Sequence, residues 1–440
     1  MKSYEQYKPS GVAWLGDVPE HWEVCRLKNI CAIYNGATPS STNPDYWDGE
    51  IIWVTPKDIN DKKFIATSGR KITQEGFQNS GTHIVPKGSV ILTTRAPIGK
   101  VTIAEQELCT NQGCKSLVIN EKVQSVFLFY LLSSSSERLN TLGTGTTFME
   151  LSAIALGNIK IALPPLYEQT AIVTYLDERT AYLERLIAKQ QALSEKLSEK
   201  RTALITEAVC GRFSINTDVE SAFLPTLRDS GIQWLGEVPE HWETWKITHL
   251  VDFIGSGTTP KSDNPEYYDG EMLWVTTSEL RENYISDTKQ KVSQEAVKNF
   301  SALKIYPKNS VAIAMYGATI GRLGILEKEA TFNQACCVFI PSEKLHYKFL
   351  FYWLWHRRPI LISLSNGGGQ PNLSQDDLKK IKIAIPNYEK QTSIAAFLDK
   401  ETAKIDCLQA KIAESIARLK EYRSALITQV VTGKIKVQGV

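Results

Sequence analysis

The segment SGVAWLGDVPEHWE at residues 10–23 returns almost unchanged as SGIQWLGEVPEHWE at residues 230–243. Further along, GATPSSTNPDYWDGEIIWVTPKDI at residues 36–59 returns as GTTPKSDNPEYYDGEMLWVTTSEL, which begins at Gly257. Shorter matches continue to the end of the chain, and the offset between the copies stays between 220 and 222 residues. Such a constant offset means that one unit is written twice, with a period far too long for a solenoid repeat.

Composition is that of an ordinary globular protein. The chain has 440 residues, 42% of them hydrophobic, and a formal net charge of +2, which suffices for two domains with separate cores. It contains no run of eighteen apolar residues, and residues 1–6 lack the pattern of an export signal, so we expect a cytoplasmic protein outside any membrane. The eight cysteines form no CxxC pair, which favours reduced thiols and predicts no metal site. The nearly neutral charge neither supports nor excludes nucleic acid as a partner.

Each copy has a globular part followed by a helical part. The globular part, residues 1–163 in the first copy and 230–385 in the second, contains short apolar runs bounded by turn residues, such as residues 51–55 and 89–94. Such runs are typical of strands. We therefore expect an α+β fold in which each globular domain is mostly β. Residues 214–229 carry no clear pattern and are predicted to link the copies.

The helical part is predicted at residues 164–213 and 386–436, where apolar residues recur in steps of three and four. Both segments begin after proline and end near a glycine, Gly211 or Gly433, as helices do. A helix of about 40 residues spans roughly 60 Å and must bury its apolar stripe. We expect the two helices to pair as an antiparallel coiled coil with pseudo-twofold symmetry; the alternative is that each packs on its own globular part. The residues predicted to pair are Leu176, Leu183, Leu186, Leu193, Leu197, Leu398, Ile405, Leu408, Ile412 and Leu419.

This organisation resembles the specificity subunits of type I restriction–modification enzymes. The likeness rests on the WLGxVPEHWE segments, a strand reading WVT, the Asn-Gln pair at residues 111–112 and 333–334, and a PxxxQ segment at 165–169 that is one residue longer at 386–391. All of these occur twice, and the likeness covers almost the full chain. It implies two target-recognition domains that each read one half of a split site in double-stranded DNA, with the paired helices setting the distance between the halves.

The resemblance also implies protein partners. In that family two modification subunits dock on the helices, bind S-adenosylmethionine and methylate adenine N6, and restriction subunits join them for cleavage. The expectation is therefore that this chain carries no cofactor and no catalytic residues of its own.

The segment most like a catalytic motif is LPPLY at residues 163–167. Amino-methyltransferases place Asp or Asn before the two prolines to accept a hydrogen bond from the target amine, and Leu163 cannot accept one. The second copy reads IPNY at residues 385–388, and the chain has no glycine-rich cofactor loop and no HExxH segment. We interpret both segments as rigid strand-to-helix turns. A self-contained DNA-modifying enzyme and a protein-binding coiled-coil scaffold remain as alternatives.

A comparison of the two copies predicts which residues contact DNA. If the copies read different half-sites, shared residues build the scaffold and base-reading residues lie in loops that differ. The sharpest contrast is Arg95 against Tyr316, because arginine grips O6 and N7 of guanine and tyrosine does not. Lys100 and Arg322 keep a positive charge in both copies, which suits phosphate contact. The other candidates are Lys57, Lys62, Lys63, Arg70 and Lys71 in the first copy and Ser278, Arg281, Tyr284, Lys289 and Lys291 in the second.

Glycine-rich segments stand at equivalent points of the two copies. Residues 143–147 read GTGTT, and residues 367–372 read GGGQPN. One interpretation is an exposed turn. The other is a loop that approaches DNA closely because it lacks bulk, with Gln370 or Asn372 reaching base edges.

Overall fold

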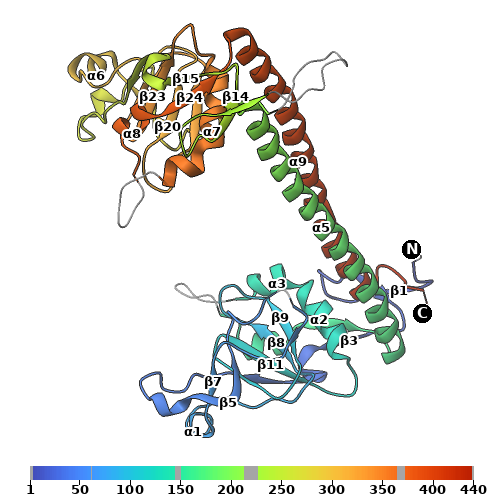
Figure 1. The fold of residues 1–440 in the computed structure, drawn as a ribbon. Helices are drawn as coiled ribbons and strands as arrows, with labels where there is room; N and C mark the ends of the chain where they lie inside the picture. The colour runs from blue at the N-terminus through green and yellow to red at the C-terminus, as the bar shows by residue number, and fades with distance from the viewer. Residues whose placement is uncertain (1–2, 61, 144–149, 213–225, 364–371, 439–440) are drawn as a thin grey trace. The chain divides into compact units, whose positions relative to one another are not determined.

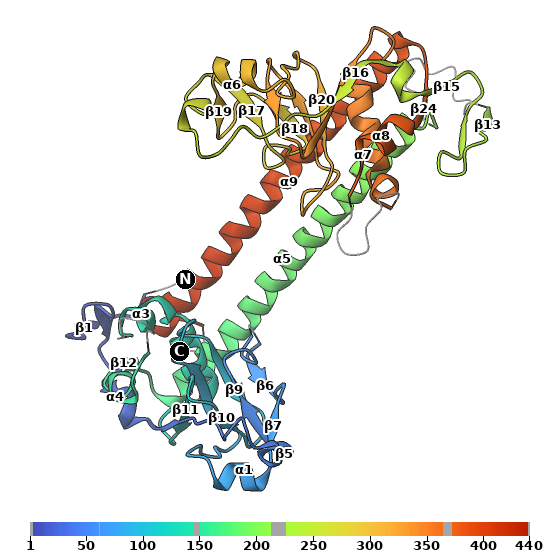
Figure 2. The same cartoon turned by 90° about the vertical axis from the view of Figure 1, so that its left-hand side faces the viewer.

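The computed structural model describes residues 3–60, 62–143, 150–212, 226–363 and 372–438. The chain forms two compact units, one of Met1–Gln191 together with Ala413–Val440 and the other of Ala192–Ile412. Each unit contains one globular head and a segment of both long helices (Figures 1 and 2). The units do not follow the order of the chain, because the end of the chain belongs with the first head.

The first head is built on two sheets. The five-stranded sheet has the order β4 (Cys31–Asn35), β11 (Cys114–Ile119), β8 (Val90–Thr93), β9 (Val101–Ala104), β6 (Phe64–Ile65), and the three-stranded sheet has the order β10 (Cys109–Thr110), β5 (Trp47–Val54), β7 (Lys71–Ile72). Two further pairs are β1 (Tyr7–Pro9) with β2 (Asp17–Pro19) and β3 (Glu23–Arg26) with β12 (Lys160–Leu163). The short helices are α1 (Gln74–Gln78), α2 (Ser125–Ser133), α3 (Ser136–Thr141) and α4 (Ala153–Gly157), with 3-10 turns η1 (Leu27–Asn29) and η2 (Pro44–Tyr46).

The second head repeats this arrangement strand for strand. Its sheets have the orders β16 (Val251–Gly255), β23 (Cys336–Pro341), β20 (Val311–Ala314), β21 (Leu323–Leu326), β18 (Asn283–Ile285) and β19 (Lys291–Val292), β17 (Met272–Val275), β22 (Thr331–Phe332). The pairs are β13 (Leu227–Asp229) with β14 (Glu237–Pro239) and β15 (Glu243–Lys246) with β24 (Lys382–Ile385). The helices are α6 (Gln294–Asn299), α7 (Tyr347–Ser363) and α8 (Gln375–Lys380), with turns η3 (Ile247–His249) and η4 (Pro265–Tyr267). The predicted tandem duplication of a mostly β domain is thus confirmed.

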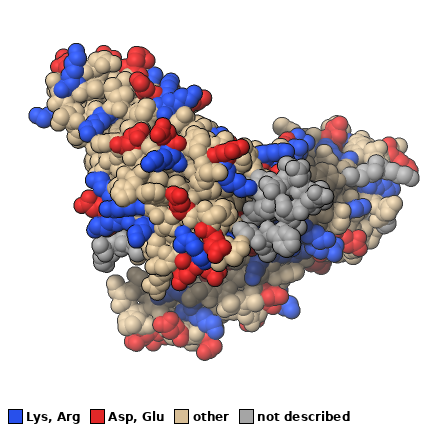
Figure 3. All heavy atoms as spheres, turned by 45° about the horizontal axis from the view of Figure 1, so that its top comes forward, with Lys and Arg blue, Asp and Glu red and all other residues tan. Residues whose placement is uncertain are grey.

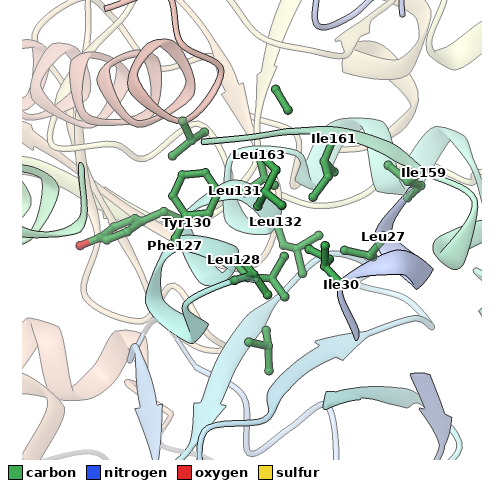
Figure 4. Packing of buried hydrophobic residues seen from close by; sticks show 14 of the residues in the cluster. Leu27, Ile30, Phe127, Leu128, Tyr130, Leu131, Leu132, Ile159, Ile161 and Leu163 are labelled. Carbon is green, nitrogen blue, oxygen red and sulfur yellow. The ribbon is translucent and has the colours of Figure 1, made fainter. Parts of the chain in front are cut away.

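The core of the first head contains α2 and the β3–β12 pair. Phe127 and Leu128 of α2 are fully buried and belong to the same apolar cluster as Ile161 and Leu163 of β12 (Figure 4). Burying such side chains stabilises the fold by about 25 cal/mol for each Å² of apolar surface removed from water. Tyr130 lies at the margin of the cluster with its hydroxyl pointing away from it (Figure 4).

Two helices of 44 residues follow the heads, α5 (Leu166–Val209) and α9 (Tyr388–Val431). Each ends before a glycine with positive φ, +68° at Gly211 and +74° at Gly433, the usual way to end a helix. A Cβ at Gly211 would lie 2.7 Å from the Trp242 ring, so a larger residue does not fit there. None of the helices within the described ranges is long and apolar enough to cross a membrane.

The long helices pair within each unit. In the first unit Gln190 Nε2 donates to Ser415 Oγ (3.0 Å), and Arg423 pairs with Glu184 (3.2 Å). In the second unit Arg201 pairs with Asp406, and Gln409 Nε2 donates to Ser198 Oγ (2.8 Å). Within each unit, a contact residue with a higher number on α5 has a partner with a lower number on α9. The predicted antiparallel pairing is therefore confirmed in both units.

Burial varies among the residues that were predicted to pair. Leu176, Leu183, Leu398 and Ile405 are buried, and Leu186, Leu197, Ile412 and Leu419 are partly exposed. Leu193 and Leu408, which were expected to lie in the seam, are 50% and 48% exposed. The reason is that the contacts near the middle of each helix are polar, through Gln190 and Gln409, while burial is concentrated where a head covers the helices.

The last turns of each helix enter the core of a head. Leu426, Val430 and Val431 of α9 belong to the core of the first head together with Trp22. The matching end of α5, Ile205, Ala208 and Val209, belongs to the core of the second head with Trp242. The alternative in which each helix packs only on its own globular part is therefore wrong, since each head is completed by the helix of the other copy.

A buried glutamine ties the start of each long helix to the head before it. Gln391 Nε2 donates to the carbonyl oxygens of Lys344 (3.0 Å) and Pro386 (2.9 Å), and its Oε1 accepts from the backbone N–H of His346 (2.8 Å). The same three contacts recur in the first head between Gln169 and Lys122, Pro164 and Gln124. In both copies the glutamine thus binds the carbonyl of the proline five residues before it, which explains why a proline and a glutamine recur at this spacing.

Replacing Gln391 with Leu is expected to destabilise the second unit. The change leaves two carbonyls and one N–H without their partner, at roughly 1–3 kcal/mol for each buried group that stays unpaired. Urea unfolding measures the loss, and Gln294→Leu at an exposed position is the control. Equal unfolding midpoints for the two variants would mean that the glutamine contributes nothing.

Candidate nucleic-acid interface

Loops from five places in the chain meet at one edge of the first head. The N–H of Asn111 donates to Val54 O (2.9 Å), and the N–H of Thr94 donates to Gly113 O (2.8 Å). The N–H of Leu151 donates to Thr94 O (2.9 Å). We call this surface the first loop edge, and it consists of residues 36–38, 55–58, 94–97, 111–115 and 150.

The second head has the equivalent surface. The N–H of Asn333 donates to Val275 O (3.0 Å), that of Met315 to Ala335 O (2.8 Å), and that of Leu373 to Met315 O (2.8 Å). The second loop edge consists of residues 257–259, 276–279, 315–318, 333–337 and 372.

Shared residues give both edges the same shape. A Cβ at Gly36 would lie 2.0 Å from a backbone oxygen, so the loop that begins there needs glycine. The hydroxyl of Thr38 donates to Gln112 Oε1, and in the second head Thr259 donates to Gln334 Oε1 (2.6 Å). The Asn-Gln pairs of the sequence thus brace the loops from within the edge.

Three charged side chains meet on the first loop edge. Arg95 Nε and Nη2 each lie 2.9 Å from Glu150 Oε2, and Lys115 Nζ lies 3.4 Å from Glu150 Oε1. The Arg95 side chain is 45% exposed, whereas that of Lys115 is 6% exposed. Burial raises the pKa of Glu150, but the hydrogen bond and charge of Arg95 and the charge of Lys115 outweigh it and hold that pKa below its usual value. Glu150 is therefore ionised at neutral pH.

The equivalent positions of the second loop edge carry no formal charge. Tyr316 and Asn372 form the same isolated β-bridge as Arg95 and Glu150. Both side chains are exposed. Cys337, at the position of the buried lysine, is fully buried, and burial raises its pKa to about 12. The two edges therefore share a backbone and differ in chemistry.

Five of the residues predicted to contact DNA lie on these edges. They are Lys57 and Arg95 on the first edge and Ser278, Tyr316 and Asn372 on the second. Lys289 lies next to the second edge, where it lines a hollow of about 250 Å³ together with Ser278. Gln370 lies outside the described residues.

Three other predicted residues line a different surface. Lys62, Lys63 and Lys100 lie around a cavity of about 1020 Å³ whose walls come from the first head and both long helices. Lys63 Nζ lies 2.5 Å from Asp177 Oδ1 and 5.1 Å from the centre of the Tyr130 ring. Lys63 thereby joins the head to α5, and the Asp177 carboxylate partly neutralises the charge of Lys63.

The remaining predicted residues lie off the loop edges, and most have protein partners. The guanidinium of Arg70 stacks 3.6 Å from the centre of the Trp47 ring, and Lys71 pairs with Glu50 (3.7 Å). In the second head Arg281, Tyr284 and Lys291 contact Ser278 O (3.0 Å), Tyr347 Oη (3.1 Å) and Glu271 (3.5 Å) respectively. Arg322 is exposed.

Sequence reasoning missed Lys115 and Glu150. Both differ between the copies, since Lys115 aligns with a cysteine and Glu150 with Asn372. Base-reading residues were expected in exposed loops, and Lys115 lies inside β11. Comparing every aligned pair of residues would have found them.

Charges of both signs are spread over the surface. In Figure 3 lysine and arginine side chains are interspersed with acidic ones over the visible face, in keeping with the net charge of +2. With so small a net charge, attraction of a polyanion would depend on local groups of charges and not on a strong overall field.

Comparison with known families identifies a DNA specificity domain in both copies. The family described as Type I restriction modification DNA specificity domain matches residues 19–194 and 239–418. Among characterised relatives, the type I restriction enzyme MjaIX specificity subunit of Methanocaldococcus jannaschii is 28% identical over 436 residues, covering 96% of each chain. The EcoBI specificity subunit of Escherichia coli is 24% identical over 76% of this chain and 71% of its own.

Solved structures show the same fold. A chain from a study of complex assembly and conformational transition in a type I R-M system superposes with a TM-score of 0.75 at 19% identity, covering 95% of this chain and 99% of that one. The HsdS subunit of Thermoanaerobacter tengcongensis gives a TM-score of 0.55 at 18% identity, covering 95% and 98%.

Proposed function

This chain belongs to the family of type I restriction modification DNA specificity domains, and on that premise we propose that it reads a two-part DNA target, one part with each loop edge. The proposed role is that of the specificity subunit, which directs the enzymes of the system to the sites that they modify or cut.

One observation carries this proposal. The same loop edge is built twice on the same strand order, yet the exposed positions at its middle hold a charged pair in one head and uncharged side chains in the other. A duplicated scaffold with different contact residues suits a protein that reads two different half-sites, because backbone shape positions the DNA and side chains select the bases.

The proposal includes partners. Two modification subunits that bind S-adenosylmethionine and methylate adenine, together with restriction subunits, would assemble on this chain, in the cytoplasm where the DNA lies. The exposed leucines of the long helices, Leu193 and Leu408, offer part of a surface for such a partner. The paired helices would set the distance between the half-sites.

We further propose that the chain is not itself catalytic. Pro164 and Pro165 form the turn between β12 and α5, as the sequence predicted. The residue before them, Leu163, cannot accept a hydrogen bond from a target amine. The chemistry would therefore come from the partners.

The test is to express the chain with the modification subunit of its own system and to map methylated adenines in the host DNA. The expected result is methylation at one two-part sequence with an unread spacer of constant length. Cells with the modification subunit alone are the control and should show none of these sites.

Two outcomes would overturn the proposal. Methylation without sequence preference, or no effect of this chain on DNA, would favour a protein-binding scaffold. Methyl transfer by the purified chain alone would make it a self-contained enzyme.

A further inference from the structure

At the middle of each loop edge lie three positions, and all three hold different residue types in the two heads. Arg95, Lys115 and Glu150 come from three separate segments of the chain and are joined by two ion pairs in the first head. None of the three residue types is kept in the second head. Three contacting residues that change as a set indicate one unit with one role.

The geometry of Arg95 shows which donors remain for a ligand. A guanidinium has five N–H donors that form two forks, one along the Nε side and one at its end. Glu150 Oε2 lies 2.9 Å from both Nε and Nη2, so it occupies the side fork. The end fork, made by Nη1 and the second Nη2 hydrogen, has no partner among the described residues.

Lys115 gives this arrangement its charge balance. A lone Arg–Glu pair has no net charge, and without Lys115 the Oε1 atom of Glu150 would lack its ion-pair partner. The nearly buried Lys115 ammonium lies 3.4 Å from that oxygen and leaves the trio with a net charge of +1. Because the Lys115 side chain is packed inside the head, Lys115 holds the Glu150 carboxylate in place while Arg95 stays accessible.

From this geometry we infer that Arg95 reads a guanine in the major groove through its end fork, and that Glu150 and Lys115 are positioning residues for it. The end fork matches the spacing of guanine O6 and N7. The second head has no guanidinium at this point, so it lacks the donor fork for this bidentate contact. The inference rests on the proposed function and names the base that one loop edge selects.

The test is selection of duplexes from a random library by the assembled complex of this chain with its modification subunits, followed by sequencing. Wild type should select two half-sites, with guanine required at one position of one half-site. Arg95→Ala should reduce the preference for that guanine by about 5- to 150-fold, the range expected for one bidentate base contact. All other positions should keep their preference.

Further variants separate base reading from charge and from folding. Arg95→Lys keeps the charge without the fork, so the guanine preference should fall while overall affinity is largely kept. Glu150→Ala should weaken the same preference, and Glu150→Gln, which keeps an acceptor oxygen, should restore part of it. Tyr316→Ala is the matched control and should alter only the other half-site.

The possible outcomes show whether the guanine assignment or the proposed function is wrong. If Arg95→Ala still selects two half-sites with every base preference unchanged, the guanine assignment is wrong and the proposed function stands. If a preference is lost at several positions of both half-sites, Arg95 acts on folding or assembly and the inference is also wrong. If wild type selects no sequence at all, the proposed function itself fails.

Discussion

Removing seven residues from each long helix is expected to shorten the unread spacer of the DNA target. The segments to remove are residues 189–195 of α5 and 411–417 of α9, which face each other according to the Gln190–Ser415 contact in the first unit and the contact of Gln409 with Ser194 O in the second. Seven residues account for about 10 Å of helix, which corresponds to at most about three base pairs of B-DNA. Removing facing segments keeps the ion pairs on either side, Arg423 with Glu184 and Arg201 with Asp406.

Mapping of methylated adenines measures the spacer directly. Lys189→Ala combined with Lys411→Ala is the control, because both residues are exposed and lie in the same segments, and the change does not alter the length of the helices. The spacer should stay as in wild type. A shortened chain that methylates half-sites at the original separation would show that the helices do not set the distance.

The second large effect is a loss of stability in one head that is caused by a substitution in the long helix of the other copy. Leu426→Ala, near the end of the chain, is expected to destabilise the first unit by about 2–5 kcal/mol. The side chain is buried in the core of the first head, with Trp22 in the same cluster. Ile205→Ala should have the corresponding effect on the second unit, where Ile205 is fully buried.

Hydrogen exchange distinguishes the two units in one sample. With Leu426→Ala the amides of β3 and β12 should exchange faster while those of β15 and β24 keep their protection, and Ile205→Ala should give the reverse. Leu419→Ala, at a partly exposed position of the same helix, should change neither set by much. Equal loss in both units from either variant would contradict the assignment of each helix end to one head.

The sequence alone determined the duplication and its consequences. A constant offset predicts two heads of the same fold, and the two heads do have the same strand order. Helix limits followed from proline at one end and Gly211 or Gly433 at the other, because these residues act on the local backbone. That the two helices pair followed from their apolar stripes, since two equal helices in one chain can bury these stripes against each other.

The tertiary structure decided everything that depends on contacts between distant segments. The stripe does not reveal that Leu193 is left exposed, or that Leu426 lies in the first head, because helical periodicity is the same whether a neighbour is present or not. Likewise Lys63 was predicted to be free for DNA, and only the fold brings Asp177 to it.

The candidate site shows the same division. Arg95 could be singled out because it differs from Tyr316 at the equivalent position. That it is held by Glu150 and Lys115 depends on three segments meeting at one edge of the head, and no local pattern contains that information. A linear sequence states which side chains are present, whereas the charge, orientation and remaining donors of each one are set by the neighbours that folding brings to it.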